Sequence, residues 1–156
     1  MKSLEEQLQT SFSSPQQRAF ILLLVTATKV EDQLNQLLKR QGLTHPQYNV
    51  LRILRGQKGQ PMMASHLTSR MIHGQSNVTR LLDKLQEKGW ITREHCTKDR
   101  RALWVNITTE GLQHLQEVDA YLAVYFQDLM PDADMAEGIN RHLDAYLTQL
   151  PETIQF

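Results

Sequence analysis

The segment Asn77–Gly111, NVTRLLDKLQEKGWITREHCTKDRRALWVNITTEG, decides the fold of this chain of 156 residues. Its first part places apolar side chains at helical spacing, and Gly89 then favours the end of that helix. Residues 90–95 and 102–107 follow as two strand-like runs, separated by the polar sequence Lys98–Arg101. A helix followed by a two-stranded hairpin with a basic tip is typical of a winged helix-turn-helix.

Helical patterns occupy most of the remaining sequence, so we expect a mainly α-helical protein with a small β-wing. Apolar periodicity predicts helices at about residues 15–40, 44–56, 63–71, 75–88, 108–130 and 132–150. Two capping boxes are predicted, Ser14 with Gln17 and Thr44 with Gln47. The last two helices each have two possible start residues: Thr108 or Thr109, and Asp132 or Asp134.

The charge of the chain is unevenly distributed, although its 17 basic and 17 acidic side chains cancel. From Leu43 to Ile107, eleven basic side chains stand against four acidic ones, a net charge of +7. From Thr108 onward, one basic side chain stands against nine acidic ones, a net charge of −8. A basic centre beside an acidic end favours a protein that binds a polyanion through one part only.

Two features of the sequence predict a cytoplasmic protein. The longest apolar run, Ala19–Val25, is far shorter than the roughly 20 residues that span a membrane, and it has no signal-peptide pattern. Cys96 is the only cysteine, so the chain forms no internal disulfide.

The helix expected from Gln75 has a packing face and a polar face. Its apolar side chains fall on one side at 100° per residue, and the groove-contacting side chains of such a helix lie near its N-terminus. We therefore expect contacts to DNA bases from Gln75, Ser76, Asn77, Thr79 and Arg80. Lys84, further along, is expected to contact a phosphate.

The hairpin tip supplies a second group of expected DNA contacts: Lys98, Arg100 and Arg101. Asp99 is expected to pair with one of the two arginines and to support the turn. The other arginine then enters the minor groove, where the negative potential is enhanced. The sequence leaves open which arginine plays which part.

The residues described above closely resemble MarR-type transcriptional regulators. The resemblance rests on VTRLLDKLQEKGWITRE at residues 78–94, KDRRALWVNITTEG at residues 98–111 and LTHPQYNVLRIL at residues 43–54. It implies a winged helix DNA-binding lobe at about residues 43–107 and dimerisation helices at about residues 14–42 and 108–150. The whole chain is then one MarR-like domain.

The resemblance further implies a homodimer that binds a pseudo-palindromic operator in double-stranded DNA and represses transcription. It implies release by a small-molecule effector, whose identity the sequence does not give. Tyr48 and Trp104 are the candidates for the edge of an effector cavity, with core packing as the alternative.

Two other functions compete with this hypothesis. A redox-responsive regulator would act through Cys96, and a winged-helix protein-interaction module would bind protein in place of DNA. No pair of histidines has the spacing of a helical metal site, and no catalytic motif is present. We therefore expect no metal, no cofactor and no enzymatic activity.

Overall fold

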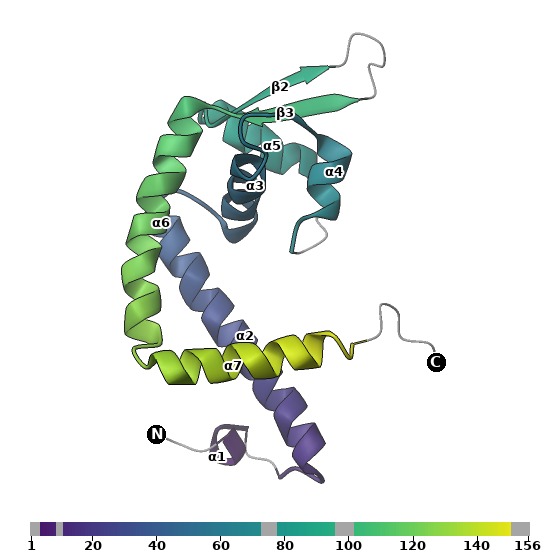
Figure 1. The fold of residues 1–156 in the computed structure, drawn as a ribbon, viewed down its shortest axis with the longest axis vertical. Helices are drawn as coiled ribbons and strands as arrows, with labels where there is room; N and C mark the ends of the chain where they lie inside the picture. Colours follow the sequence, from purple (N-terminus) through teal and green to yellow (C-terminus); the bar gives the residue numbers. More distant parts are fainter. Residues whose placement is uncertain (1–3, 9–10, 73–77, 96–101, 151–156) are drawn as a thin grey trace. The chain divides into compact units, whose positions relative to one another are not determined.

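The computed structural model describes residues 4–8, 11–72, 78–95 and 102–150, which form two compact units, residues 1–115 and 116–156 (Figure 1). The expected fold class is confirmed: the protein is mostly helical, with one small antiparallel sheet. No helix within the described ranges is long and apolar enough to cross a membrane. The helices are α1 (Leu4–Leu8), α2 (Pro15–Arg40), α3 (His45–Arg55), α4 (Ala64–Ser69), α5 (Val78–Glu87), α6 (Thr109–Leu129) and α7 (Ala133–Leu147).

α2 begins as predicted, with a different partner for one glutamine. The side chain of Ser14 accepts a hydrogen bond of 3.2 Å from the backbone N–H of Gln17, and Pro15 occupies the first helical position. The Gln17 side chain, however, accepts from the backbone N–H of Ser13 at 2.7 Å rather than from Ser14. The prediction of a reciprocal box between Ser14 and Gln17 is therefore wrong, because the extended chain brings the preceding N–H within reach.

α3 begins with the predicted capping box. Thr44 Oγ1 accepts from the N–H of Gln47 at 3.4 Å, and Gln47 Oε1 accepts from the N–H of Thr44 at 3.0 Å. Two backbone donors that have no partner inside the helix are satisfied in this way. The apolar face of α3 then enters the core of the first unit with fully buried Val50, Leu51 and Leu54.

The sheet has three strands, β1 (Met62–Met63), β2 (Ile91–His95) and β3 (Leu103–Ile107), in the order β1-β3-β2. β3 pairs with β2 from Ile91↔Ile107 to His95↔Leu103, and with β1 through Met62↔Val105. The sequence predicted β2 and β3 but not β1, so the sheet has one strand more than expected. Met62–Met63 belongs to a strand, and the short helix α4 begins only at Ala64.

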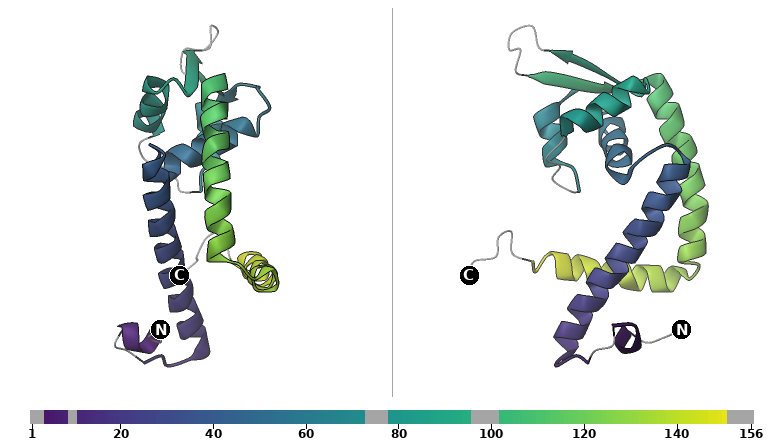
Figure 2. Two further views of the ribbon diagram at one scale, coloured as in Figure 1. Left: turned by 90° about the vertical axis from the view of Figure 1, so that its left-hand side faces the viewer. Right: turned by 180° about the vertical axis from the view of Figure 1, so that it is seen from behind.

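The inner face of the sheet lies against the helices of the first unit. Ile91, Val105 and Ile107 are buried there, and α3, α4 and α5 all contact the strands. The views in Figures 1 and 2 show these three helices on the same side of the sheet. Asn49 of α3 also accepts a 3.1 Å hydrogen bond from the N–H of Ile72, which fixes the chain after α4.

The structure shows which residue caps each of the last two helices, where the sequence left two candidates for each. Thr108, not Thr109, caps α6, since its Oγ1 accepts a 3.0 Å hydrogen bond from the N–H of Gly111. Asp132, not Asp134, caps α7 by accepting from the N–H of Met135 at 3.1 Å. α7 ends at Leu147, slightly before the predicted end at residue 150.

Candidate nucleic-acid interface

α5 presents a polar face to solvent because its leucines are buried. Leu82 and Leu85 are 1% and 0% exposed, and the helix packs against α3 and β2. Thr79, Arg80 and Lys84 are exposed on the same helix. The helical periodicity of the sequence therefore separated the packing residues of α5 from its solvent-facing residues correctly.

Arg93 joins β2 to α5 through two side chains of the helix. Its Nη2 lies 2.7 Å from Oδ1 of Asp83, and its Nε donates a hydrogen bond to Oε1 of Gln86. The Arg93 side chain is only 20% exposed, so solvent screens this pair less than an ordinary surface pair. The planar guanidinium, with its fixed donor directions, is suited to hold two neighbouring acceptors one helical turn apart.

This role of Arg93 was not predicted from the sequence. The residue stood out only as one charge of the basic segment, because contacts between a strand and a helix have no periodic signal. One signal was available in the sequence. Side chains alternate along a strand, so Arg93 points to the inner face of the sheet while Thr92 and Glu94 point outward.

The two basic residues of α5 differ in their local partners. Lys84 Nζ lies 2.8 Å from Oε2 of Glu87, and both side chains are more than half exposed. Such surface pairs contribute about 0–1 kcal/mol, so Lys84 can exchange this partner for a phosphate. Arg80 makes no ion pair with any residue that the structure describes.

A second set of contacts fixes the C-terminal end of α5 to the end of α2. The Lys88 ammonium donates a hydrogen bond to the carbonyl oxygen of Gly42 and lies 4.7 Å from the centroid of the Trp90 ring. Trp90 stacks on His114 with a centroid separation of 4.2 Å. His114 Nε2 in turn lies 3.0 Å from the carbonyl oxygen of Gln41. The ends of α2 and α5 and the start of α6 therefore meet in one cluster.

The start of α6 passes very close to the chain at Trp90. The N–H of Thr108 donates to the carbonyl oxygen of Trp90 at 3.0 Å, and Thr108 Oγ1 donates to the carbonyl oxygen of Gly89 at 2.7 Å. A Cβ atom at Gly111 would lie 2.2 Å from the carbonyl oxygen of Trp90. Only glycine fits at this position.

Comparisons with known proteins identify the family to which this fold belongs. The sequence pattern of the MarR family matches residues 43–103. The HTH-type transcriptional repressor MdtR of Bacillus subtilis is 32% identical over 129 residues, which cover 80% of this chain and 80% of MdtR. The chain belongs to the MarR family.

Two further similarities extend over most of the chain. The HTH-type transcriptional regulator PrsX of Escherichia coli is 25% identical over 138 residues, covering 85% of this chain and 83% of PrsX. A crystal structure of a mutant MarR from E. coli complexed with operator DNA superposes with a TM-score of 0.71. It covers 94% of this chain and 99% of that one at 22% identity. At this identity, the superposition shows a shared winged helix fold and no shared role.

Several of the predicted site residues of this MarR-family chain lie outside the described residues. They are Gln75, Ser76 and Asn77 before α5, and Cys96, Lys98, Asp99, Arg100 and Arg101 between β2 and β3. The strands on either side of the second group are paired up to His95 and Leu103. Of the predicted DNA contacts, the structure places Thr79, Arg80 and Lys84.

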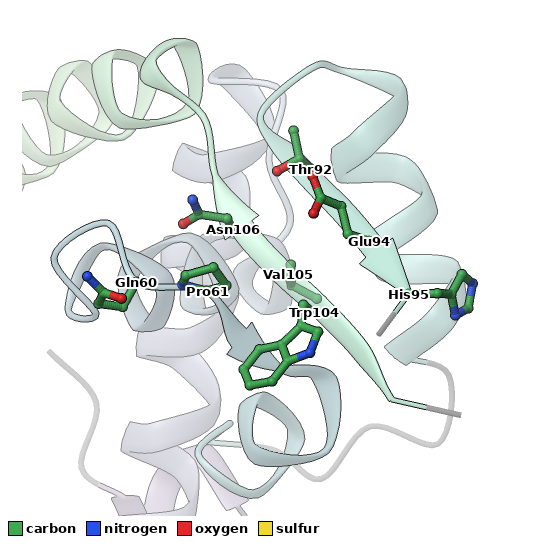
Figure 3. Close-up of a pocket in the computed structure, with 8 residues that line it drawn as sticks. All are labelled: Gln60, Pro61, Thr92, Glu94, His95, Trp104, Val105 and Asn106. Carbon is green, nitrogen blue, oxygen red and sulfur yellow. The ribbon is translucent and has the colours of Figure 1, made fainter. Parts of the chain in front are cut away.

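The two candidate effector residues differ in their exposure to solvent. Tyr48 is 6% exposed in α3, and the Arg52 guanidinium carbon lies 5.7 Å from its ring centroid. Trp104 is 37% exposed on β3 and lines a pocket on the sheet to which Tyr48 does not contribute (Figure 3). Among the described residues, no group of three or more His, Cys, Asp and Glu side chains could hold a metal ion.

Proposed function

We propose that this MarR-family protein is a cytoplasmic, sequence-specific transcriptional repressor that binds a pseudo-palindromic operator as a homodimer. The observation that carries the proposal is the exposed face of α5. It offers Thr79, Arg80 and Lys84 to solvent, while Arg93 fixes the helix to β2. The repressor MdtR, which is 32% identical, and the operator complex of the E. coli MarR mutant support this proposal.

The proposed DNA contacts divide into base-reading and phosphate-binding residues. In the proposal, Arg80 donates to guanine O6 and N7, with Thr79 and the preceding Gln75, Ser76 and Asn77 near other base edges. Lys84 neutralises a phosphate. Between β2 and β3, one of Arg100 and Arg101 enters the minor groove. Asp99 pairs with the other, and Lys98 adds positive charge.

Exposed apolar side chains support the proposed homodimer. On α2, Phe20, Leu22 and Leu24 are 53%, 40% and 49% exposed, and on α7 Leu147 is 67% exposed. Large apolar side chains exposed at this density are typical of an interface with another chain. We propose that residues 14–42 and 108–150 form the dimer interface, and that residues 43–107 form the DNA-binding lobe.

A dimer provides a simple mechanism for release by a small molecule. Its two α5 helices must lie about 34–36 Å apart to enter successive major grooves. A ligand that binds more tightly to a dimer with another separation lowers the affinity for the operator. A small-molecule effector acting in this way is part of the proposal.

Fluorescence anisotropy with DNA from the promoter region of the protein's own gene tests the proposal. The full chain is titrated over a range of salt concentrations, with a shuffled duplex of the same composition as control. We expect tighter binding to the promoter duplex and a linear fall of log affinity with log salt concentration. An intact dimer without any sequence preference contradicts the repressor and favours a protein-interaction module. Loss of binding in peroxide by the wild type, but not by Cys96→Ser, favours a redox regulator instead.

A further inference from the structure

A hollow of about 560 Å³ lies on the sheet, on the face opposite the helices. This volume is in the range of pockets that bind small molecules. Figure 3 shows side chains of β2 and β3 beside residues that precede β1. The lining residues are Gln60, Pro61, Thr92, Glu94, His95, Trp104, Val105 and Asn106.

The strand register creates this surface. In the antiparallel pair, Glu94 lies opposite Trp104, and Thr92 lies opposite Asn106. Residues opposite each other share one face of the sheet, so these two pairs project away from the helices. Val105 between them is fully buried on the inner face.

Two hydrogen-bond acceptors in the hollow have no partner among the described residues. Asn106 Oδ1 is buried and accepts no hydrogen bond within the described part of the chain. The Glu94 carboxylate forms no ion pair or hydrogen bond with the residues that the structure describes. A buried acceptor without a donor is unfavourable, so a ligand N–H that reaches Asn106 Oδ1 removes that cost. The exposed Glu94 carboxylate adds attraction for a positively charged ligand.

Trp104 adds a surface that attracts positive charge. Its indole is 37% exposed and lines the hollow, so a ligand there can contact the ring. A cation over an indole face is held by the ring quadrupole, and tryptophan is the strongest of the aromatic side chains in this respect. In Figure 3 the His95 imidazole projects away from the other lining side chains.

We propose that this hollow is a binding site for a small organic cation with a flat apolar body, such as an aromatic amidine or amine. Its N–H groups donate to Glu94 and Asn106 Oδ1, and its ring packs on Trp104. An aromatic acid of the same shape places its carboxylate beside Glu94 and is repelled. The site therefore selects a small organic cation over an aromatic acid of the same shape.

Because the site lies on β2, a ligand bound there can alter the position of α5. Thr92 and Glu94 contact the hollow, and Arg93 between them holds Asp83 of α5. A cation that shifts β2 therefore also shifts the anchor of α5. This effect on DNA affinity rests on the proposed function, whereas binding of the cation does not.

Benzamidine, with benzoate as the anion of similar shape, tests the site on the full chain without DNA. Calorimetry at millimolar concentration is expected to give saturable binding for benzamidine and none for benzoate. In ¹⁵N-labelled protein the indole N–H signal of Trp104 should shift on titration, and Trp104→Phe identifies that signal among the two tryptophans. Equal binding of benzoate, or an unmoved Trp104 signal, overturns the proposal.

Two variants test the polar contacts. Glu94→Gln and Asn106→Leu should each weaken benzamidine binding by about tenfold or more, because each loses a hydrogen bond or charge pair to the cation. Glu110→Gln removes an exposed carboxylate outside the hollow and should leave binding unchanged. Thermal unfolding of each variant excludes a folding defect. Unchanged binding by Glu94→Gln contradicts the proposal.

The DNA measurement separates this site from the proposed function. Benzamidine is expected to change the affinity for the promoter duplex in the wild type but not in Glu94→Gln. A protein that binds benzamidine but no DNA retains the site and loses the repressor assignment. A protein that binds DNA but no benzamidine retains the repressor assignment and loses the site.

Discussion

Arg93 in β2 and Asp83 in α5 form an ion pair with an Nη2–Oδ1 distance of 2.7 Å. The two residues are ten positions apart and belong to different kinds of secondary structure. Their contact fixes the orientation of α5 relative to the sheet, on the side of the helix next to its exposed polar face. Arg93 therefore acts on DNA, in the proposed function, by positioning the residues that touch it.

A double-mutant cycle should give a measurable coupling between these two residues. We expect Arg93→Gln and Asp83→Asn to couple by about 1 kcal/mol in urea unfolding, because Arg93 is largely shielded from solvent. The exposed pair Lys84 and Glu87, tested with Lys84→Gln and Glu87→Gln, is the control and should couple by less than about 0.5 kcal/mol. A larger coupling in the control pair contradicts the effect expected from shielding.

Replacing Arg80 and Lys84 should affect DNA binding in different ways. Arg80→Ala should lose about 1–3 kcal/mol of discrimination at one base pair of each half-site, since a bidentate base contact disappears. Lys84→Ala should weaken binding to all duplexes alike and reduce the salt slope by about one. Anisotropy with a set of single-substitution duplexes measures both effects. Uniform weakening by Arg80→Ala means that Arg80 binds phosphate.

Alanine should have opposite effects at two helical glycines. Gly111→Ala places a Cβ atom 2.2 Å from the Trp90 carbonyl oxygen, so α6 must move away from Trp90. We expect a loss of at least about 2 kcal/mol in the free energy of unfolding. Gly138→Ala in α7 meets no atom within 4 Å and should be neutral or stabilise by up to about 1 kcal/mol. Urea unfolding of both variants measures the difference, and equal effects rule out the close approach as the cause.

A charge in the exposed apolar surface of α2 should weaken the proposed dimer. Phe20 is 53% exposed, and Phe20→Glu would bury an unpaired carboxylate in the interface. We expect the dimer dissociation constant to rise by at least about tenfold, seen as monomer in sedimentation velocity. Ser65→Glu on α4, at an exposed polar position outside the proposed interface, adds the same charge and should leave the dimer intact. Identical behaviour of the two variants excludes Phe20 from an interface.

The sequence allowed the prediction of features that depend on neighbouring residues. The capping box of Thr44 and Gln47 was predictable because both its hydrogen bonds lie within four residues. The buried face of α5 was predictable because Leu82 and Leu85 repeat with the period of a helix. Local geometry is sufficient in both cases.

Features that depend on distant residues were not predictable in this way. β1 is two residues long, too short for any alternation, and it exists only because Met62 and Met63 pair with Val105 and Trp104. The anchoring role of Arg93 likewise needs the position of α5 on the sheet. Tyr48 and Trp104 were candidates for the edge of an effector cavity, with core packing as the alternative. α3 buries Tyr48 in the core, whereas strand alternation turns Trp104 outward.

Because side chains alternate along β2, substitutions on its two faces affect different contacts. The odd position, Arg93, faces the helix, and the even positions, Thr92 and Glu94, face the hollow. A substitution at an even position can therefore alter what the outer surface accepts while the helix keeps its anchor. Within these five residues, the proposed cation site and the anchor of α5 can therefore change independently.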